Sequence, residues 1–201
     1  MNNMRKSKYF EKIKPLLKKP FFTSKEARKR GVPSRMLIYF YKKGFLERLG
    51  KGIYKDTKYL SNIDVDLEDL VLVAKSIRDG VICLISALYF YELTDQIMRE
   101  YWIAIPNKNR VPKRDFTRIF RMRNMTLGLK KIKIGNIEVK IFDRERTIVD
   151  AFRYLDKETA LKALANYFKD KKHKPNIKKI IDYSNKLNIN INSYIVAMTY
   201  E

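Results

Sequence analysis

Basic and hydroxyl-bearing side chains that suit nucleic-acid contacts concentrate in one short stretch near the N-terminus. Arg35 can donate two hydrogen bonds to O6 and N7 of a guanine, the commonest base-specific contact in DNA recognition. Ser34 and Tyr39 can bond to bases or phosphates, and Lys42 and Lys43 suit phosphate oxygens. The residue types in this stretch therefore indicate a surface that binds DNA.

The charge of the chain favours the same class of partner. Lys and Arg number 44 against 22 Asp and Glu, which gives a net charge of +22. Residues 1–60 hold 18 basic and 4 acidic side chains, a net charge of +14, whereas residues 61–201 hold 26 and 18, a net charge of +8. Because the shorter segment has the larger charge, we expect two domains, a DNA-binding domain at 1–60 and a second domain at 61–201.

Three helical patterns must position the basic stretch. KYFEKIKPLLKK repeats apolar residues at helical spacing and predicts a first helix. Thr23 and Glu26 fit a capping box at the start of a second, short helix, which Gly31 ends. A third helix opens at Pro33 or Ser34. Two helices joined by a short turn that contains glycine form a helix-turn-helix.

The third helix should bury one face and expose the other. We expect it to end at Gly44 and to pack Leu37, Phe40 and Tyr41 inward. The outer face would then present the recognition residues Ser34, Arg35, Ile38, Tyr39 and Lys42.

A hairpin follows directly. FLERL and IYK read as two short strands around Gly50-Lys51-Gly52, which predicts the wing of a winged helix. Arg48, Lys51 and Lys55 would lie along the flanking phosphates or the minor groove. The alternative is a winged helix that contacts a protein, with basic faces that are merely solvated.

The second domain begins with helices and a strand. Asp64 and Asp66 have a spacing that could suit a metal, but acids at the start of a helix are also favoured by its dipole, and we prefer that interpretation. CLISALYFYEL predicts a helix capped at Ser86. YWIAI predicts a buried strand that Pro106 closes.

The remainder adds a hairpin and four helices. KIKIGNIEVKIF alternates isoleucine or valine with charged residues around Gly135-Asn136. Asp143, Asp156 and Pro175 then start three helices, and NSYIVAMTY forms the last. We therefore expect an α+β protein, with an N-terminal winged helix-turn-helix followed by a mixed α+β domain that has a small sheet and a helical C-terminal half.

A second basic surface lies between the strand and the hairpin. KNRVPKRDFTRIFRMR contains seven basic residues against one acid, Asp115. These are Lys108, Arg110, Lys113, Arg114, Arg118, Arg121 and Arg123. Two interpretations are open. These residues belong either to a solvated loop and edge strand or to a second surface that contacts a polyanion, DNA or RNA.

The sequence contains few residues from which a catalytic or metal site could be built. The single histidine, His173, lies in a basic loop, so a triad or a histidine-based metal site has no basis. Asp143, Glu145 and Asp150 form a dense acidic cluster, which we interpret as a helix cap and ion pairs with neighbouring arginines. The single cysteine, Cys83, sits in an apolar run and reads as a core residue. We expect no catalytic residues, no metal and no cofactor.

Targeting signals are also missing from the sequence. No apolar run approaches the roughly 20 residues that span a bilayer, and MNNMRKSKYF has no apolar secretory segment. We therefore expect no membrane partner and a cytoplasmic protein.

Four stretches together resemble the AbiEi-type antitoxins, the regulator half of abortive-infection toxin–antitoxin pairs. They are TSKEARKRGVPSRMLIYFYKKGFLERLGKGIY, ISALYFYELT, YWIAIP and FDRERTIVDAFRYL. The resemblance implies that the winged helix binds inverted repeats in the promoter of its own operon and represses it. It also implies that the second domain opposes a nucleotidyltransferase-like toxin, with or without a stable complex. The DNA-contacting positions it implies are Ser34, Arg35, Tyr39, Lys42, Arg48 and Lys51.

Two other functions stay open on the sequence. One is a plain transcriptional repressor whose second domain senses a ligand or dimerises. The other is a nucleic-acid-processing enzyme that uses the second basic surface as its substrate track.

Overall fold

The structure is a computed structural model of the chain that describes residues 8–50, 52–59, 65–114, 116–134 and 137–199. The chain divides into two compact units, one of residues 1–72 with 134–137 and one of residues 73–133 with 138–201. This division falls inside helix α4 (Val65–Ser76). The domain boundary predicted between residues 60 and 61 lies outside the described residues and stays a prediction.

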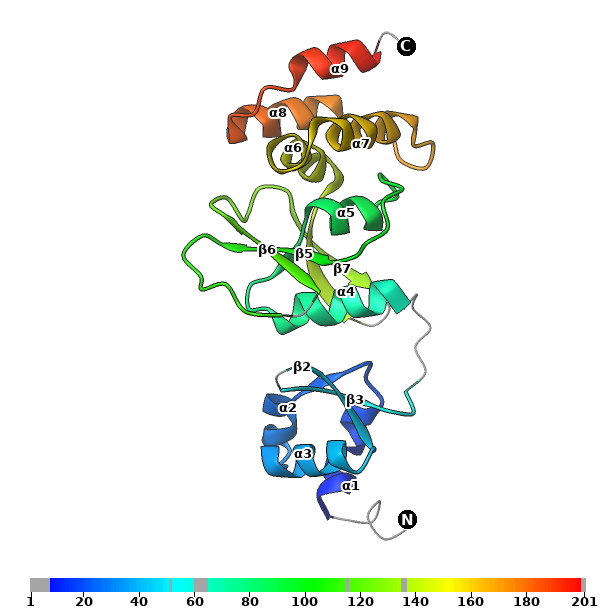
Figure 1. Cartoon of the computed structure of the whole chain (residues 1–201), viewed down its shortest axis with the longest axis vertical. Coiled ribbons are helices and arrows are strands. Elements are labelled where there is room, and N and C mark those ends of the chain that lie inside the picture. The colour runs from blue at the N-terminus through cyan, green and yellow to red at the C-terminus, as the bar shows by residue number, and fades with distance from the viewer. Residues whose placement is uncertain (1–7, 51, 60–64, 115, 135–136, 200–201) are drawn as a thin grey trace. The chain divides into compact units, whose positions relative to one another are not determined.

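Before the start of α4, the first unit contains three described helices and a small sheet, which Figure 1 shows. Its elements are α1 (Lys8–Leu17), β1 (Phe22–Thr23), α2 (Ser24–Lys29), α3 (Ser34–Lys42), β2 (Leu46–Gly50) and β3 (Ile53–Asp56). The strands are antiparallel in the order β1-β3-β2. Three helices followed by the β2–β3 hairpin make a winged helix-turn-helix, as the sequence predicted. The two-residue strand β1 was not predicted.

A capping box starts α2, as predicted. The Thr23 Oγ1 accepts from the Glu26 backbone N at 3.2 Å, and the Thr23 backbone N donates to the Glu26 carboxylate at 2.8 Å. Burial opposes the shift, but hydrogen bonds from Lys19 and Thr23 lower the pKa of Glu26. The box therefore fixes where α2 begins and so how the chain enters the helix-turn-helix.

An aromatic and aliphatic core holds the three helices together. Phe10 of α1 meets Phe40 of α3 edge to face, with ring centroids 5.4 Å apart. Val32, in the turn between α2 and α3, and Leu37 are fully buried beside them. Phe40 is also fully buried, so α3 is fixed by its inner face, and its outer face is free for another task.

The second unit is built around a five-stranded sheet in the order β6-β5-β4-β8-β7. Its strands are β4 (Val81–Ile82), β5 (Tyr101–Pro106), β6 (Thr117–Met122), β7 (Leu129–Ile134) and β8 (Ile137–Phe142). β4 pairs antiparallel with β5 and parallel with β8, whereas β6 is parallel to β5 at one edge. The strands of the predicted hairpin are present, and its Gly135-Asn136 turn lies outside the described residues.

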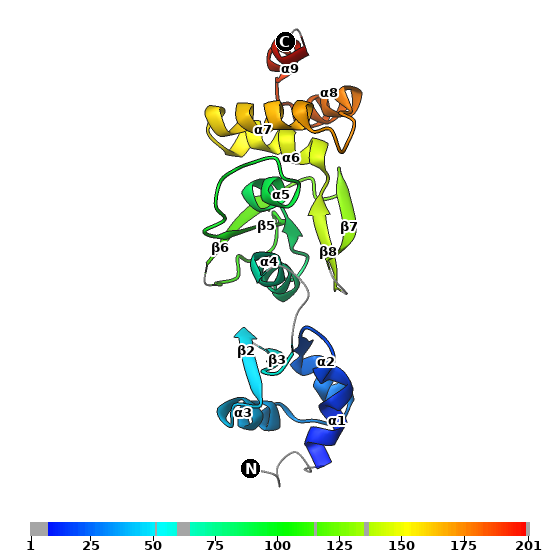
Figure 2. The same cartoon turned by 90° about the vertical axis from the view of Figure 1, so that its right-hand side faces the viewer.

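Helices cover this sheet and form the C-terminal half, as predicted. They are α4 (Val65–Ser76), α5 (Leu84–Phe90), α6 (Arg144–Tyr154), α7 (Lys157–Lys169), α8 (Ile177–Leu187) and α9 (Asn192–Thr199). Figure 2 shows α6, α7 and α8 packed together, with α9 beyond them. Their shared core includes Ile148, Leu164, Tyr167 and Ile180.

Two predicted helix starts in the second unit were wrong. Ser86 does not cap α5, because the cap position is Cys83, and Ser86 is buried inside the helix. There its Oγ accepts from the Trp102 backbone N at 2.8 Å and so joins the helix to β5. Asn176, not Pro175, caps α8 by accepting from the Lys179 backbone N at 3.0 Å.

Candidate nucleic-acid interface

The outer face of α3 presents polar, basic and aromatic side chains to solvent. Ser34, Arg35 and Lys42 are exposed, and Ile38 is 44% and Tyr41 45% exposed. The helix begins at Ser34, so the first two of these residues lie in its first turn. In a helix-turn-helix, N-terminal residues of the second helix are those that contact base edges.

Tyr39 and Tyr41 of α3 differ in burial from the sequence prediction, which placed Tyr39 on the outer face and Tyr41 on the inner face. Tyr39 is half-buried, packs against the core of the first unit and lies 5.9 Å from the Phe40 ring. Tyr41 was predicted to pack inward and instead faces solvent. The spacing of Ser34, Ile38 and Tyr41 at i, i+4 and i+7 is the signal that places Tyr41 on the outer face.

The cations of α3 and of its C-cap have no anionic partner within the described ranges of the chain. Among the residues that the structure describes, none forms a hydrogen bond or ion pair with the side chains of Arg35, Lys42 or Lys43. Like charges gathered on one face repel each other and attract a polyanion. This face can therefore hold phosphates while Arg35 and Ser34 reach a base.

Of the three wing cations expected to contact DNA, the structure shows one, Arg48, exposed. Arg48, on β2, is exposed and lies opposite Tyr54 of β3, and its Nε donates to the Gly50 carbonyl at 3.3 Å. Lys51 lies outside the described residues. Lys55 was predicted to face phosphates, but its Nζ pairs with the Glu68 carboxylate at 2.7 Å with only 18% of its side chain exposed. An ion pair of this kind removes Lys55 from the expected interface.

The wing is tied to the start of α2. Gly52 has φ +77°, and a Cβ at this position would lie 2.9 Å from the Ser24 Oγ. The Ser24 backbone N donates to the Gly52 carbonyl at 2.8 Å. Glycine is required here by both the left-handed backbone and the close approach. The position of the hairpin is therefore set by the helix-turn-helix itself.

The second basic surface maps to the β5–β6 connection, to β6 and to the residue after it. Six of its seven members are exposed. These are Lys108, Arg110, Lys113, Arg118, Arg121 and Arg123. The Arg118 guanidinium stacks over the Trp102 ring, with 4.7 Å to the ring centroid. β6 is thus an edge strand whose outward side chains are mainly arginines.

Arg114 differs from the other six members. It is half-buried, its Nε donates to the Ser76 Oγ at 3.3 Å, and a terminal nitrogen lies 3.4 Å from the Ser76 carbonyl. These contacts bind the β5–β6 connection to the end of α4. Arg114 therefore stabilises the unit and contributes little to a binding surface.

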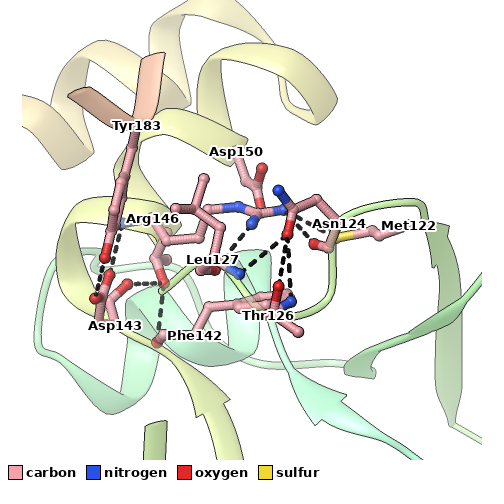
Figure 3. A network of polar contacts seen from close by, with 10 residues as sticks. Met122, Asn124, Thr126, Leu127, Phe142, Asp143, Arg146, Asp150 and Tyr183 are labelled. Atoms are coloured by element: carbon pink, nitrogen blue, oxygen red, sulfur yellow. Dashed lines mark hydrogen bonds and ion pairs between the residues drawn. The ribbon is translucent and has the colours of Figure 1, made fainter. Parts of the chain in front are cut away.

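The acidic residues of α6 and its cap are buried and paired, and Figure 3 shows the contacts of Asp143 and Asp150. Asp143 caps α6 by accepting from the Arg146 backbone N at 2.9 Å, and Asp150 accepts from the Arg146 Nε at 2.8 Å. The same guanidinium donates to the carbonyls of Leu127 at 2.9 Å and Asn124 at 3.2 Å. Burial raises the pKa of Asp150 to about 6, although Arg146 opposes that rise. The predicted interpretation of this cluster as a cap and ion pairs is correct for Asp143 and Asp150.

Glu145 completes this network from the other side of α6. Its carboxylate accepts from the Tyr167 hydroxyl at 2.8 Å and from the Lys179 Nζ at 2.9 Å. Burial opposes the shift, but these bonds lower the pKa of Glu145. Lys179 also lies 2.9 Å from Asp143. The sequence had predicted that Glu145 pairs with a neighbouring arginine. The structure shows instead that Glu145 pairs with Lys179 on α8.

The rest of the described chain offers no metal centre. No group of three or more His, Cys, Asp or Glu residues lies close enough to hold an ion within the described ranges. His173 is exposed and contacts Asp170 at 3.0 Å. Cys83 is buried, and burial raises the pKa of its thiol well above the usual value. Among the described helices, none has the length and apolar character needed to cross a membrane.

Comparison with known proteins finds a family model that matches part of the first unit. No curated protein matches the chain. The model of one family, described as transcriptional regulator, AbiEi antitoxin, matches residues 11–54, which run from within α1 into β3. The matched family is regulatory, and its match covers the winged helix. Residues 11–54, which form the winged helix-turn-helix, are therefore similar to the AbiEi antitoxin regulators, and the match confirms over this segment the resemblance seen in the sequence.

Proposed function

We propose that this protein represses its own operon by inserting α3 into the major groove of inverted repeats in the promoter. Arg35 and Ser34 contact bases, Lys42 and Lys43 hold phosphates, and the wing follows the backbone with Arg48 and Lys51. The observation that carries this proposal is that Arg35 and Lys42 of α3, and Lys43 at its C-cap, are exposed and have no partner among the described residues. The match of residues 11–54 to a family of antitoxin regulators supports it.

The second half of the proposal concerns the antitoxin activity. Residues 61–201 counteract a nucleotidyltransferase-like toxin, and the exposed members of the second basic surface form the working face. Six exposed cations on one edge strand and its connections repel each other, which costs stability unless an anionic surface binds there. Neither a stable complex with the toxin nor a particular mechanism is required by this proposal.

A promoter-binding assay tests the first half. Footprinting on the DNA upstream of the gene should detect protected inverted repeats for the wild-type chain. Replacing Arg35, Lys42 and Lys43 together with Ala should abolish protection. The matched control replaces Lys130, Lys131 and Lys133 of β7 with Ala, which removes the same charge from exposed positions outside the first unit. Equal loss in both variants would mean that overall charge, not α3, binds the DNA.

A co-expression assay tests the second half. The variant should replace Arg110, Lys113 and Arg118 with Ser and leave Arg114 in place, because Arg114 holds the end of α4. It should keep promoter protection but lose rescue of cells that express the neighbouring toxin. The β7 triple variant again serves as the control. Full rescue by the Arg110, Lys113 and Arg118 variant would show that the surface is merely solvated.

A further inference from the structure

A groove of about 800 Å³ lies in the second unit, between the end of β6, the last turn of α6 and the turn that follows α8. Four exposed cations line it, namely Arg121, Arg123, Arg153 and Lys186. Two of them belong to the second basic surface, whereas Arg153 and Lys186 come from helices. The groove therefore gathers charge from three elements that are distant in the sequence.

The cations of the groove are largely uncompensated. Arg121 and Arg123 form no hydrogen bond or ion pair with any residue in the described part of the chain. The Arg153 guanidinium stacks over the Tyr154 ring, 5.4 Å from its centroid. Only Lys186 has a described anionic partner, Asp182, at 2.7 Å. The groove consequently keeps a net positive charge that an anion would neutralise.

One wall of the groove is fixed by the buried network of α6. Arg146 bonds to the carbonyls of Asn124 and Leu127 and is itself held by Asp150 (Figure 3). Gly128 has φ +70°, and a Cβ there would lie 2.6 Å from the Cβ of Arg146. This close approach locks the segment after β6 onto α6. Arg123, which precedes that segment, is therefore held in the lining of the groove.

A further part of the lining is the turn that follows α8, which presents amide side chains. Asn188 ends α8 in a left-handed conformation, with φ 54° and ψ 49°. The Ile189 backbone N donates to the Ser184 carbonyl at 2.9 Å, which fixes the turn. Asn188 and Asn107 line the groove, as do Asn124 and Asn190, whose Oδ1 atoms already accept from the backbone N of Leu127 and of Asn192. Their side chains carry both donors and acceptors.

From this arrangement we propose that the groove binds a nucleotide, with the arginines on its phosphate and the amides on its base edge. Guanidinium groups bind phosphate through paired hydrogen bonds, and asparagine amides bond to base edges. The volume lies within the range of about 300–1,000 Å³ typical of small-molecule sites. The nucleotide is either a free nucleoside triphosphate or one unit of a single-stranded RNA. This inference concerns the second unit alone and does not depend on operator binding.

Binding of three probes to the full-length chain tests the proposal. The probes are ATP by calorimetry, a fluorescein-labelled ten-nucleotide single-stranded RNA by anisotropy, and sodium phosphate by calorimetry. The test variant combines Arg123→Ser with Arg153→Ser. The control combines Lys130→Ser with Lys133→Ser, which removes the same charge from β7 at the other edge of the sheet. A second test variant, Asn188→Gly, removes one amide and keeps the left-handed turn.

The expected result is that ATP or the RNA binds the wild-type chain and the β7 control with the same affinity. The arginine variant should lose at least tenfold in affinity, and Asn188→Gly a smaller but measurable factor. Binding of ATP identifies the free nucleotide as the source, and binding of the RNA alone identifies the strand. Equal loss in the β7 control, phosphate binding as tight as ATP binding, or no binding of ATP and RNA would each overturn the proposal. Promoter protection that falls in parallel with probe binding would also overturn it, because the groove would then be part of the operator surface.

Discussion

Two helices of this protein are rich in charge and use it in opposite ways. α3 carries Arg35 and Lys42 on an exposed face with no described partner. α6 carries Arg146 and Asp150 almost fully buried, in contact with each other and with the backbone carbonyls of Asn124 and Leu127. The charges of α3 are therefore available to another molecule, whereas those of α6 are paired inside the protein.

The difference shows why a run of charges in a sequence does not identify a binding site. What separates the two helices is their apolar pattern. In α3 the buried positions are Leu37 and Phe40, so the charges are left on the opposite face. In α6 nearly the whole helix is buried, including Arg144 and Arg146. Charges on such a helix must be paired, because an isolated buried charge is strongly unfavourable.

The largest expected effect comes from breaking the pairing in α6. Arg146→Met should leave Asp150 and two carbonyls without a partner and lower the free energy of unfolding by about 3–5 kcal/mol. Arg153→Met, at an exposed position of the same helix, should change it by less than about 0.5 kcal/mol. Urea denaturation of both variants measures the difference. A small effect of Arg146→Met would mean that the buried pair is dispensable.

The same variant has a defined pH dependence. The folded-state pKa of Asp150 is raised, to about 6 in the wild-type chain, and loss of the Arg146 charge raises it further. Because the folded protein binds this proton more tightly than the unfolded chain does, the free energy of unfolding falls as the pH rises toward and through the folded-state pKa of Asp150. The deficit of Arg146→Met relative to wild type should therefore be smaller at pH 5 than at pH 8. An equal deficit at both values would exclude charge as its cause.

The corresponding change in α3 should affect binding and leave folding intact. Arg35→Ala should weaken operator binding by about 1–3 kcal/mol and relax specificity at one base position. The free energy of unfolding should stay within about 0.5 kcal/mol of wild type, because Arg35 is exposed and no described residue pairs with it. Gel shifts against single-base operator variants measure specificity. Lys42→Ala is the matched comparison, and it should weaken all sequences alike and lower the salt dependence of binding.

A smaller effect is expected at the cap that positions the helix-turn-helix. Thr23→Ala should lower the free energy of unfolding of the first unit by about 0.5–2 kcal/mol, because α2 loses its N-cap. Thr23→Ser keeps the capping oxygen and should be close to wild type. Thermal denaturation followed by circular dichroism compares the two. Full stability of Thr23→Ala would show that tertiary packing alone sets the start of α2.

The smallest effect separates the two tyrosines of α3. Tyr41→Phe removes an exposed hydroxyl and should weaken operator binding by about 0.5–1.5 kcal/mol if that hydroxyl bonds to DNA. Tyr39→Phe, at the half-buried position, should change operator affinity less. Anisotropy titrations with a labelled operator resolve differences of this size. A larger loss for Tyr39→Phe would restore the recognition role that the sequence assigned to Tyr39.

Local patterns made most of the fold predictable. The Thr23 and Glu26 spacing located α2, and alternation of apolar residues in residues 131–142 located β7 and β8. The strands β1 and β4 were missed because two residues are too short to show any period. Ser86 was taken for a cap because serine favours that position, but its hydroxyl bonds to a strand far along the chain.

The residues of the candidate site were predictable only where the helical period alone determines which side chains are exposed. Ser34, Arg35 and Lys42 followed from the helical period and are exposed as expected. Contacts between distant residues left no local signal. The Glu68 partner of Lys55 and the Ser76 partner of Arg114 are set by packing, so pairing removed two predicted contacts from the surface.

The strand pairing of the two units also implies an order of folding during synthesis. In the first unit the most distant strand partners are Phe22 and Tyr54, so its sheet can close once β3 has left the ribosome. In the second unit β4 must wait for β8, since Ile82 pairs with Ile141. Long-range pairing of this kind slows folding, and domains of a nascent chain fold as units from the N-terminal end. We therefore expect the winged helix to be competent to occupy DNA while the ribosome is still translating the remainder of the same chain.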